Sequence, residues 1–167
     1  MSDEVKKRLS GYWKLEAVNI LLIPAALVLL SSAQLGWLSL LAFLPMMLLL
    51  AIGAYYWRAK LHQITRAGSG FDLAIRRIGQ LQWPSLGLML TTCLIVIYAW
   101  TEPGWFRGSW DKGAATFASV LSVLEYVNYY HRQLQHFDNW PDFKRLLRGK
   151  GLRRSQMARD LKAYRNK

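Results

Sequence analysis

Residues 17–57 read AVNILLIPAALVLLSSAQLGWLSLLAFLPMMLLLAIGAYYW, a run of 41 residues without a single Asp, Glu, Lys or Arg. At about 1.5 Å per residue, one straight helix of this length would reach roughly 60 Å, about twice the hydrocarbon thickness of a bilayer. The run is therefore expected to lie in a membrane and to fold back on itself. The polar and small residues of 31–36 (SSAQLG) are the natural turn, so the run predicts a helical hairpin.

Two further uncharged runs, 78–101 and 113–124, extend this pattern along the chain. Aromatic residues such as Tyr12, Trp57 and Trp83 stand at the ends of the apolar segments, where interfacial anchors are found. The sequence thus predicts an all-α polytopic membrane protein with four transmembrane helices in an antiparallel bundle and with cytoplasmic amphipathic helices. The expected spans cover about 12–30, 37–57, 82–101 and 113–130, and Trp83-Pro84 is expected in the first turn of the third.

The charges outside these spans predict the topology of the chain. Residues 1–14, 58–83 and 131–167 carry net charges of +2, +4 and +8, whereas the loop 101–113 is neutral. By the positive-inside rule, both termini and the basic loop 58–81 are expected in the cytoplasm. We therefore expect an integral protein of a bacterial inner (plasma) membrane, with a transmembrane domain over 1–132 and a basic cytoplasmic tail over 133–167.

Glu125 is the most informative polar residue, because it falls inside the last apolar segment, seven residues before Arg132. Ionisable groups in membrane spans usually face the bundle interior and often mark functional sites. A spacing of three and four residues places Glu125 on one predicted helix face with Asn128, Tyr129, Arg132 and His136, and toward the other leaflet small residues continue this face: Ala114, Ala118 and Ser122. The pattern predicts a tightly packed outer half and a polar cavity that opens toward the cytoplasm.

Two roles for Glu125 follow from this position. As a structural residue it would be protonated, or would bond Tyr55, Tyr56, Asn19 or a neighbouring subunit. As a functional residue it would bind a ligand, ion or lipid headgroup, or would act in catalysis with His131 as a second catalytic group.

The three histidines, His62, His131 and His136, all fall near the predicted cytoplasmic boundary and invite a metal site with Glu125, Asp72 or Asp138. His131 and His136 are five residues apart, which matches one helix face poorly, and no HExxH or cysteine-rich pattern is present. The sequence therefore favours interfacial histidines, with a metal site as the alternative. No cofactor is expected; haem in particular would need histidines within the spans.

The basic segments indicate contact with anionic headgroups. Arg76 and Arg77 interrupt an apolar pattern from Phe71 to Leu81, which predicts a short amphipathic helix at the membrane surface. In the tail, one helix is expected from Asn139 with three basic residues, Lys144, Arg145 and Arg148. A second is expected from Ser155, with an apolar face of Met157, Leu161 and Tyr164. Docking on a partner protein and binding of ribosomal RNA are the alternatives for this tail.

Two function classes are compatible with these features. The first is a non-catalytic accessory, assembly or scaffold subunit of a membrane complex, or a homo-oligomer, whose tail contacts lipid headgroups or a partner. The alternative is a small membrane enzyme or transport element for a lipid or amphipathic substrate at the cytoplasmic face, with a site of Glu125, Asn128, Tyr129, His131 and His136. No nucleophile pattern or phosphate loop is present to favour an enzyme.

Overall fold

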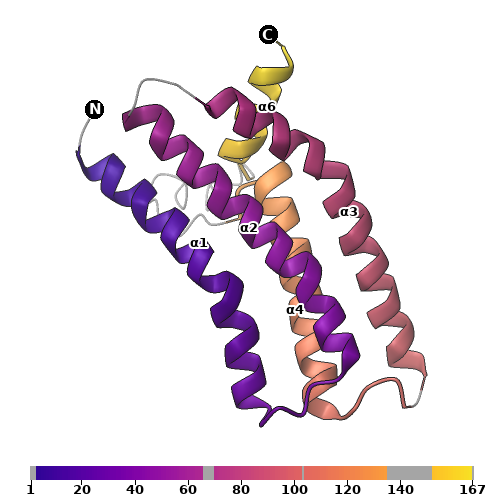
Figure 1. Cartoon of the computed structure of the whole chain (residues 1–167). Helices are drawn as coiled ribbons and strands as arrows, with labels where there is room; N and C mark the ends of the chain where they lie inside the picture. The colour runs from indigo at the N-terminus through magenta and orange to yellow at the C-terminus, as the bar shows by residue number, and fades with distance from the viewer. Residues whose placement is uncertain (1–2, 66–69, 103, 135–151, 167) are drawn as a thin grey trace.

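The described part of the chain forms helices packed around a central one. The computed structural model describes residues 3–65, 70–102, 104–134 and 152–166. Within them the helices are α1 (Asp3–Leu30), α2 (Trp37–Thr65), α3 (Phe71–Thr101), α4 (Ser109–Tyr130) and α6 (Gln156–Arg165). Helix α2 packs against α1, α3 and α4, and α6 packs across α3 and α4 (Figure 1).

The molecule has two distinct ends. The start of α1 and the short helix α6 lie at one of them, which we call the basic end (Figure 1). The connections from α1 to α2 and from α3 to α4 lie together at the other, which we call the turn end (Figure 1). A hydrogen bond from the Gly36 N–H to Asp111 Oδ1, 2.8 Å long, joins the connection from α1 to α2 to the first turn of α4.

Three of the described helices, α1, α2 and α3, are long and apolar enough to cross a membrane. This confirms the all-helical class, and it indicates that the chain associates with a membrane. Helix α4, with 22 residues, is not among these three, so the fourth crossing stays a prediction.

The basic loop is more helical than expected. Helix α2 continues to Thr65, and α3 already begins at Phe71. The prediction of a separate surface helix over 71–81 is wrong, because this segment is continuous with the third apolar helix and buries Phe71, Ile75 and Ile78 against the protein. Pro84 accordingly lies in the interior of α3 and not in its first turn.

The buried side chains form two clusters along α2. The cluster near the turn end joins Leu38, Phe43 and Met46 to small residues of α4, including Ala115 and Ala118. Ala114, Ala118 and Ser122 are all buried, as the spacing predicts, and small side chains allow α4 to approach α2 closely.

The cluster near the basic end contains Tyr56, Tyr126 and Tyr129, and it includes Met157 and Leu161 from α6. The expected second tail helix is therefore confirmed, with Ser155 as its N-cap: the Ser155 hydroxyl accepts a bond from the Ala158 N–H. The division into a membrane domain and a tail stays a prediction, but α6 itself is part of the core.

Asp111 organises the turn end. Its side chain is fully buried, and its carboxylate accepts hydrogen bonds from the N–H groups of Gly36, Ser39 and Arg107 and from the Ser39 hydroxyl. Burial alone raises the pKa of Asp111, but the bonds from Ser39, Arg107 and Gly36 outweigh it and hold this pKa below its ordinary value. A Cβ at position 36 would lie 2.5 Å from Asp111 Oδ2, which explains the glycine there.

Candidate functional site

An acid–tyrosine cluster, which we define as Glu16, Glu125 and Tyr129, lies between α1 and α4. Glu125 and Tyr129 are one turn apart on α4, and Glu16 reaches them from α1, so that both carboxylates are close to the Tyr129 hydroxyl. Tyr129 is only 3% exposed, whereas the two glutamates are half-buried. The tyrosine is seated against Gly53 of α2, where an added Cβ would lie 2.3 Å from its hydroxyl oxygen.

The polar atoms of this cluster are incompletely bonded. Within the described residues, neither the Tyr129 hydroxyl nor Glu125 Oε2 has a hydrogen-bond partner. Since buried polar groups normally find partners, these two unbonded atoms mark the cluster as a candidate site.

The polar residues predicted to share one helix face with Glu125 do not all share it in the structure. Helix α4 ends at Tyr130, so Arg132 follows the helix and does not continue its face. Asn128 uses its Oδ1 to accept a bond from the Leu134 N–H, 2.9 Å away. His131 packs beside Tyr126, with ring centroids 5.6 Å apart, and His136 lies outside the described residues.

Glu16 is the member of the cluster that the sequence analysis did not identify. Its only signal was its position, as the last charged residue before the 41-residue uncharged run. The partners expected for Glu125 were instead Tyr55, Tyr56 and Asn19. Tyr56 is engaged elsewhere, because its hydroxyl donates to Asp160 Oδ2 at 2.7 Å.

Asp160 fastens α6 to α2. In addition to the bond from Tyr56, its carboxylate forms an ion pair with Lys60, with Nζ and Oδ2 2.7 Å apart and both side chains largely buried. A short antiparallel pairing adds to this, with the Gln133 N–H bonded to the Arg153 carbonyl and the Ser155 N–H to the His131 carbonyl. These contacts hold α6 in a defined place at the basic end.

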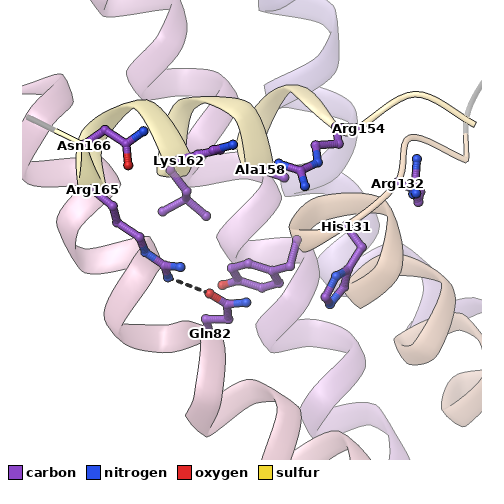
Figure 2. A pocket seen from close by; sticks show the side chains of 10 residues that line it. Gln82, His131, Arg132, Arg154, Ala158, Lys162, Arg165 and Asn166 are labelled. Atoms are coloured by element: carbon purple, nitrogen blue, oxygen red, sulfur yellow. Dashed lines mark hydrogen bonds between the residues drawn. The ribbon is translucent and has the colours of Figure 1, made fainter.

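A pocket of about 400 Å³, which we call the basic pocket, opens between α3, the end of α4 and α6. Figure 2 shows Gln82 on α3 bonded to Arg165 on α6, with His131 and Arg132 arriving from the end of α4. Four of the residues that line the pocket are cationic: Arg132, Arg154, Lys162 and Arg165. Of these, only Arg132 was a predicted site residue.

Other predicted binding residues lie elsewhere. Arg76 and Arg77 are exposed on α3 and do not line the basic pocket. Lys144, Arg145 and Arg148 lie outside the described residues, as do the helix expected from Asn139 and two candidate metal ligands, His136 and Asp138. In the ranges that the structure describes, no group of three or more His, Cys, Asp or Glu side chains is arranged to hold a metal ion.

Comparison of the chain with protein families, with curated proteins and with solved structures finds no match.

Proposed function

We propose that this chain is a non-catalytic integral membrane protein, an accessory, assembly or scaffold subunit of a membrane complex. In this proposal α4 crosses the membrane beside α1, α2 and α3 to complete an antiparallel four-helix bundle. The basic end faces the cytoplasm of a bacterial cell, and its tail contacts lipid headgroups or a partner.

The observation that carries the proposal is the surface of α1. None of the residues in its most apolar window is buried within the chain, whereas 56% of the corresponding window of α2 is buried. Leu22 and Leu29, for example, are 55% and 78% exposed. Helix α1 therefore presents a broad apolar surface along which a helix of another subunit can pack.

The acid–tyrosine cluster adds specificity to this surface. Glu16 and Glu125 are half-buried, and the Tyr129 hydroxyl has no hydrogen-bond partner among the described residues. In an apolar layer, polar side chains stabilise helix association when a neighbouring helix offers a bonding partner. A partner helix with a Ser, Thr, Asn or Gln at this depth would bond the half-buried carboxylate of Glu16 on α1.

The orientation follows from the charges at the two ends. Residues 58–83 and 131–167 carry most of the positive charge, and the connection over 101–113 at the turn end is neutral. The start of α1 and α6 lie at the same end of the molecule (Figure 1), as an even number of crossings requires. This supports a cytoplasmic basic end.

Site-specific photo-crosslinking in native membranes tests the proposal. A photoreactive residue at exposed Leu22 should give adducts of discrete mass with another protein. The same residue at Leu49, which is fully buried, serves as the control and should give none. Lipid adducts alone at Leu22, together with a monodisperse monomer in mild detergent, would contradict the proposal.

A second candidate function is supported by the buried Tyr129 hydroxyl beside two carboxylates. This is the transport or conversion of a lipid or other amphipathic substrate at the cytoplasmic face, with Glu125 as the proton acceptor. His131 lines the basic pocket, so it would bind the substrate headgroup there.

The alternative is tested with a fluorescent anionic lipid in proteoliposomes, by assaying its translocation and modification. The Glu125→Gln variant should lose either activity while folding normally, whereas Glu102→Gln, an exposed glutamate at the turn end, should not. Unchanged folding, partners and activity in Glu125→Gln would exclude a functional role for this carboxylate.

A further inference from the structure

We propose that the basic pocket is a binding site for a phosphate-bearing anion, either the headgroup of an anionic lipid or free phosphate. The inference rests on the membrane function proposed above, and it assigns a ligand class to one site at the basic end.

The charge of the pocket is of one sign. Arg132, Arg154, Lys162 and Arg165 come from two segments separated in the sequence, and no Asp or Glu is among the lining residues. The single acidic residue of α6, Asp160, is directed to Lys60 on α2 instead. The carboxylate of α6 thus pairs with α2, while two cations of α6, Lys162 and Arg165, line the pocket.

The four cations are also uncompensated. Among the described residues, none of them forms an ion pair. Their side-chain hydrogen bonds go to neutral acceptors, from Arg132 to the Leu152 carbonyl and from Arg165 to Gln82 Oε1. Positive charges held near one another repel, and an anion bound among them replaces this repulsion with charge-assisted hydrogen bonds.

The pocket is built on rigid elements. The backbone pairing of His131 and Gln133 with Arg153 and Ser155 holds the two cationic segments side by side. Met157 and Leu161 anchor α6 in the core. The backbone segments that carry the cations are therefore in place before a ligand arrives, which lowers the entropic cost of binding. The four cationic side chains themselves are exposed at the mouth of the pocket.

The depth of the pocket suits a lipid phosphate. Gln82 lines it and is followed by Trp83, which is 71% exposed at the position expected for an interfacial anchor. The arginines and Lys162 therefore lie near the predicted level of the phosphates, where basic pockets between helices bind anionic headgroups.

The experiment uses the full chain and a charge-matched control. The pocket variant is Arg154→Gln with Arg165→Gln. The control is Lys14→Gln with Arg159→Gln, which removes the same charge from exposed residues at the basic end that do not line the pocket. Circular dichroism and thermal unfolding confirm that both variants fold, so that a loss of binding is not a loss of structure.

Two arms distinguish the sources of phosphate. In the lipid arm, the protein is taken from nanodiscs of phosphatidylcholine with 20% phosphatidylglycerol (about one lipid in five, enough to supply anionic headgroups), and native mass spectrometry counts the retained phosphatidylglycerol. In the free-anion arm, calorimetry measures binding of inorganic phosphate to the protein in neutral detergent. The pocket variant should bind about thirtyfold more weakly than the control, as expected for the loss of two cations near a phosphate.

Weaker binding in the lipid arm alone identifies a headgroup site, and weaker binding in both arms identifies a general phosphate site. Equal binding by the pocket variant and the control would overturn the inference, as would no binding by the wild type in either arm. If the photo-crosslink at Leu22 fails while the pocket variant still loses its ligand, the proposed subunit function fails and the phosphate site stands.

Discussion

At the turn end, the buried carboxylate of Asp111 accepts four hydrogen bonds, whereas toward the basic end the half-buried carboxylate of Glu125 has an oxygen with no hydrogen-bond partner in the described ranges. The two residues lie near opposite ends of the same helix, α4. The four bonds use the hydrogen-bonding capacity of the Asp111 carboxylate within the chain, so Asp111 is a structural residue. One oxygen of the Glu125 carboxylate keeps unused hydrogen-bonding capacity.

The same contrast holds for the positive charges. Near the turn end, Lys112 lies over the ring of Trp100, with Nζ 3.6 Å from the ring centroid. At the basic end, the four cations of the basic pocket form no ion pair in the described part of the chain. Charged side chains at the turn end are bonded within the chain. Binding of an external partner or ligand should therefore be sought at the basic end.

The largest expected effect is that of Asp111→Ala. The substitution leaves the N–H groups of Gly36, Ser39 and Arg107 without their acceptor, so it should lower the free energy of unfolding by about 3 kcal/mol or more. Reversible unfolding in mixed micelles, followed by tryptophan fluorescence, measures the change. Glu102→Ala, an exposed neighbour, is the control and should change stability little.

Acid should weaken the turn end in the wild type. The pKa of Asp111 is lower in the folded chain than in the unfolded chain, so the unfolded state binds more protons as the pH falls. The stabilisation is complete above about pH 4, the ordinary aspartate pKa, and is lost as the pH falls through the folded value. In Asp111→Asn this component of the acid dependence should disappear from unfolding curves taken between these limits.

Gly53, against which Tyr129 packs, should be the next position at which a substitution lowers stability. Gly53→Ala places a methyl group within 2.5 Å of Tyr129 Cζ, so the ring must shift, at a cost of about 1–3 kcal/mol. Gly87→Ala is the matched control in α3, where an added Cβ meets nothing within 4 Å and alanine should slightly favour the helix. Equal stability of the two variants would show that Tyr129 is not tightly held against α2.

Removal of the Asp160 carboxylate should release α6 locally. Asp160→Ala removes the bonds to Tyr56 and Lys60, and amide protection in α6 should fall about tenfold in hydrogen exchange while α2 keeps most of its protection. Arg159→Ala changes an exposed neighbour on the same helix and should leave protection unchanged. If α6 stays protected in Asp160→Ala, then Met157 and Leu161 hold it without this carboxylate.

The smallest effect is expected for Lys112→Met. The variant keeps the aliphatic part of the side chain and removes the cation over Trp100, which should cost about 0.5–1 kcal/mol. A double-mutant cycle with Trp100→Leu isolates this contact from other changes. A coupling energy of zero would show that the cation does not stabilise the turn end.

The features that depend on local patterns could be predicted from the sequence. The ends of α1, α3 and α4 at Leu30, Thr101 and Tyr130 agree with the expected span ends, because turn residues and interfacial aromatics follow the apolar runs. The helix after Ser155 was also predicted, since a capping residue and one apolar face suffice to define it. Periodicity did not reveal that the segment from Phe71 continues into α3, because nothing local separates two helices in line from one long helix.

The candidate site was predicted only in part. Glu125 and Tyr129 were found because they share one helix face. Glu16 was not identified, since contact between α1 and α4 depends on how the helices pack. The basic pocket was missed for the same reason: Gln82 is far in the sequence from Arg154, Lys162 and Arg165, and the tail was expected to be separate from the core.

The sequence by itself determined that the chain is helical and that it has apolar segments long enough to cross a membrane, because hydrophobicity and helical period are properties of neighbouring residues. Its charge distribution also predicts which end is basic. The tertiary structure alone decided which polar groups are satisfied. Asp111 meets the start of α2, and Asp160 meets Lys60. Among the described residues, one oxygen of Glu125 has no hydrogen-bond partner and the four cations of the basic pocket form no ion pair. Hydrogen bonds and ion pairs depend on distances of a few ångströms between segments remote in the chain, and only the packing of the helices sets those distances.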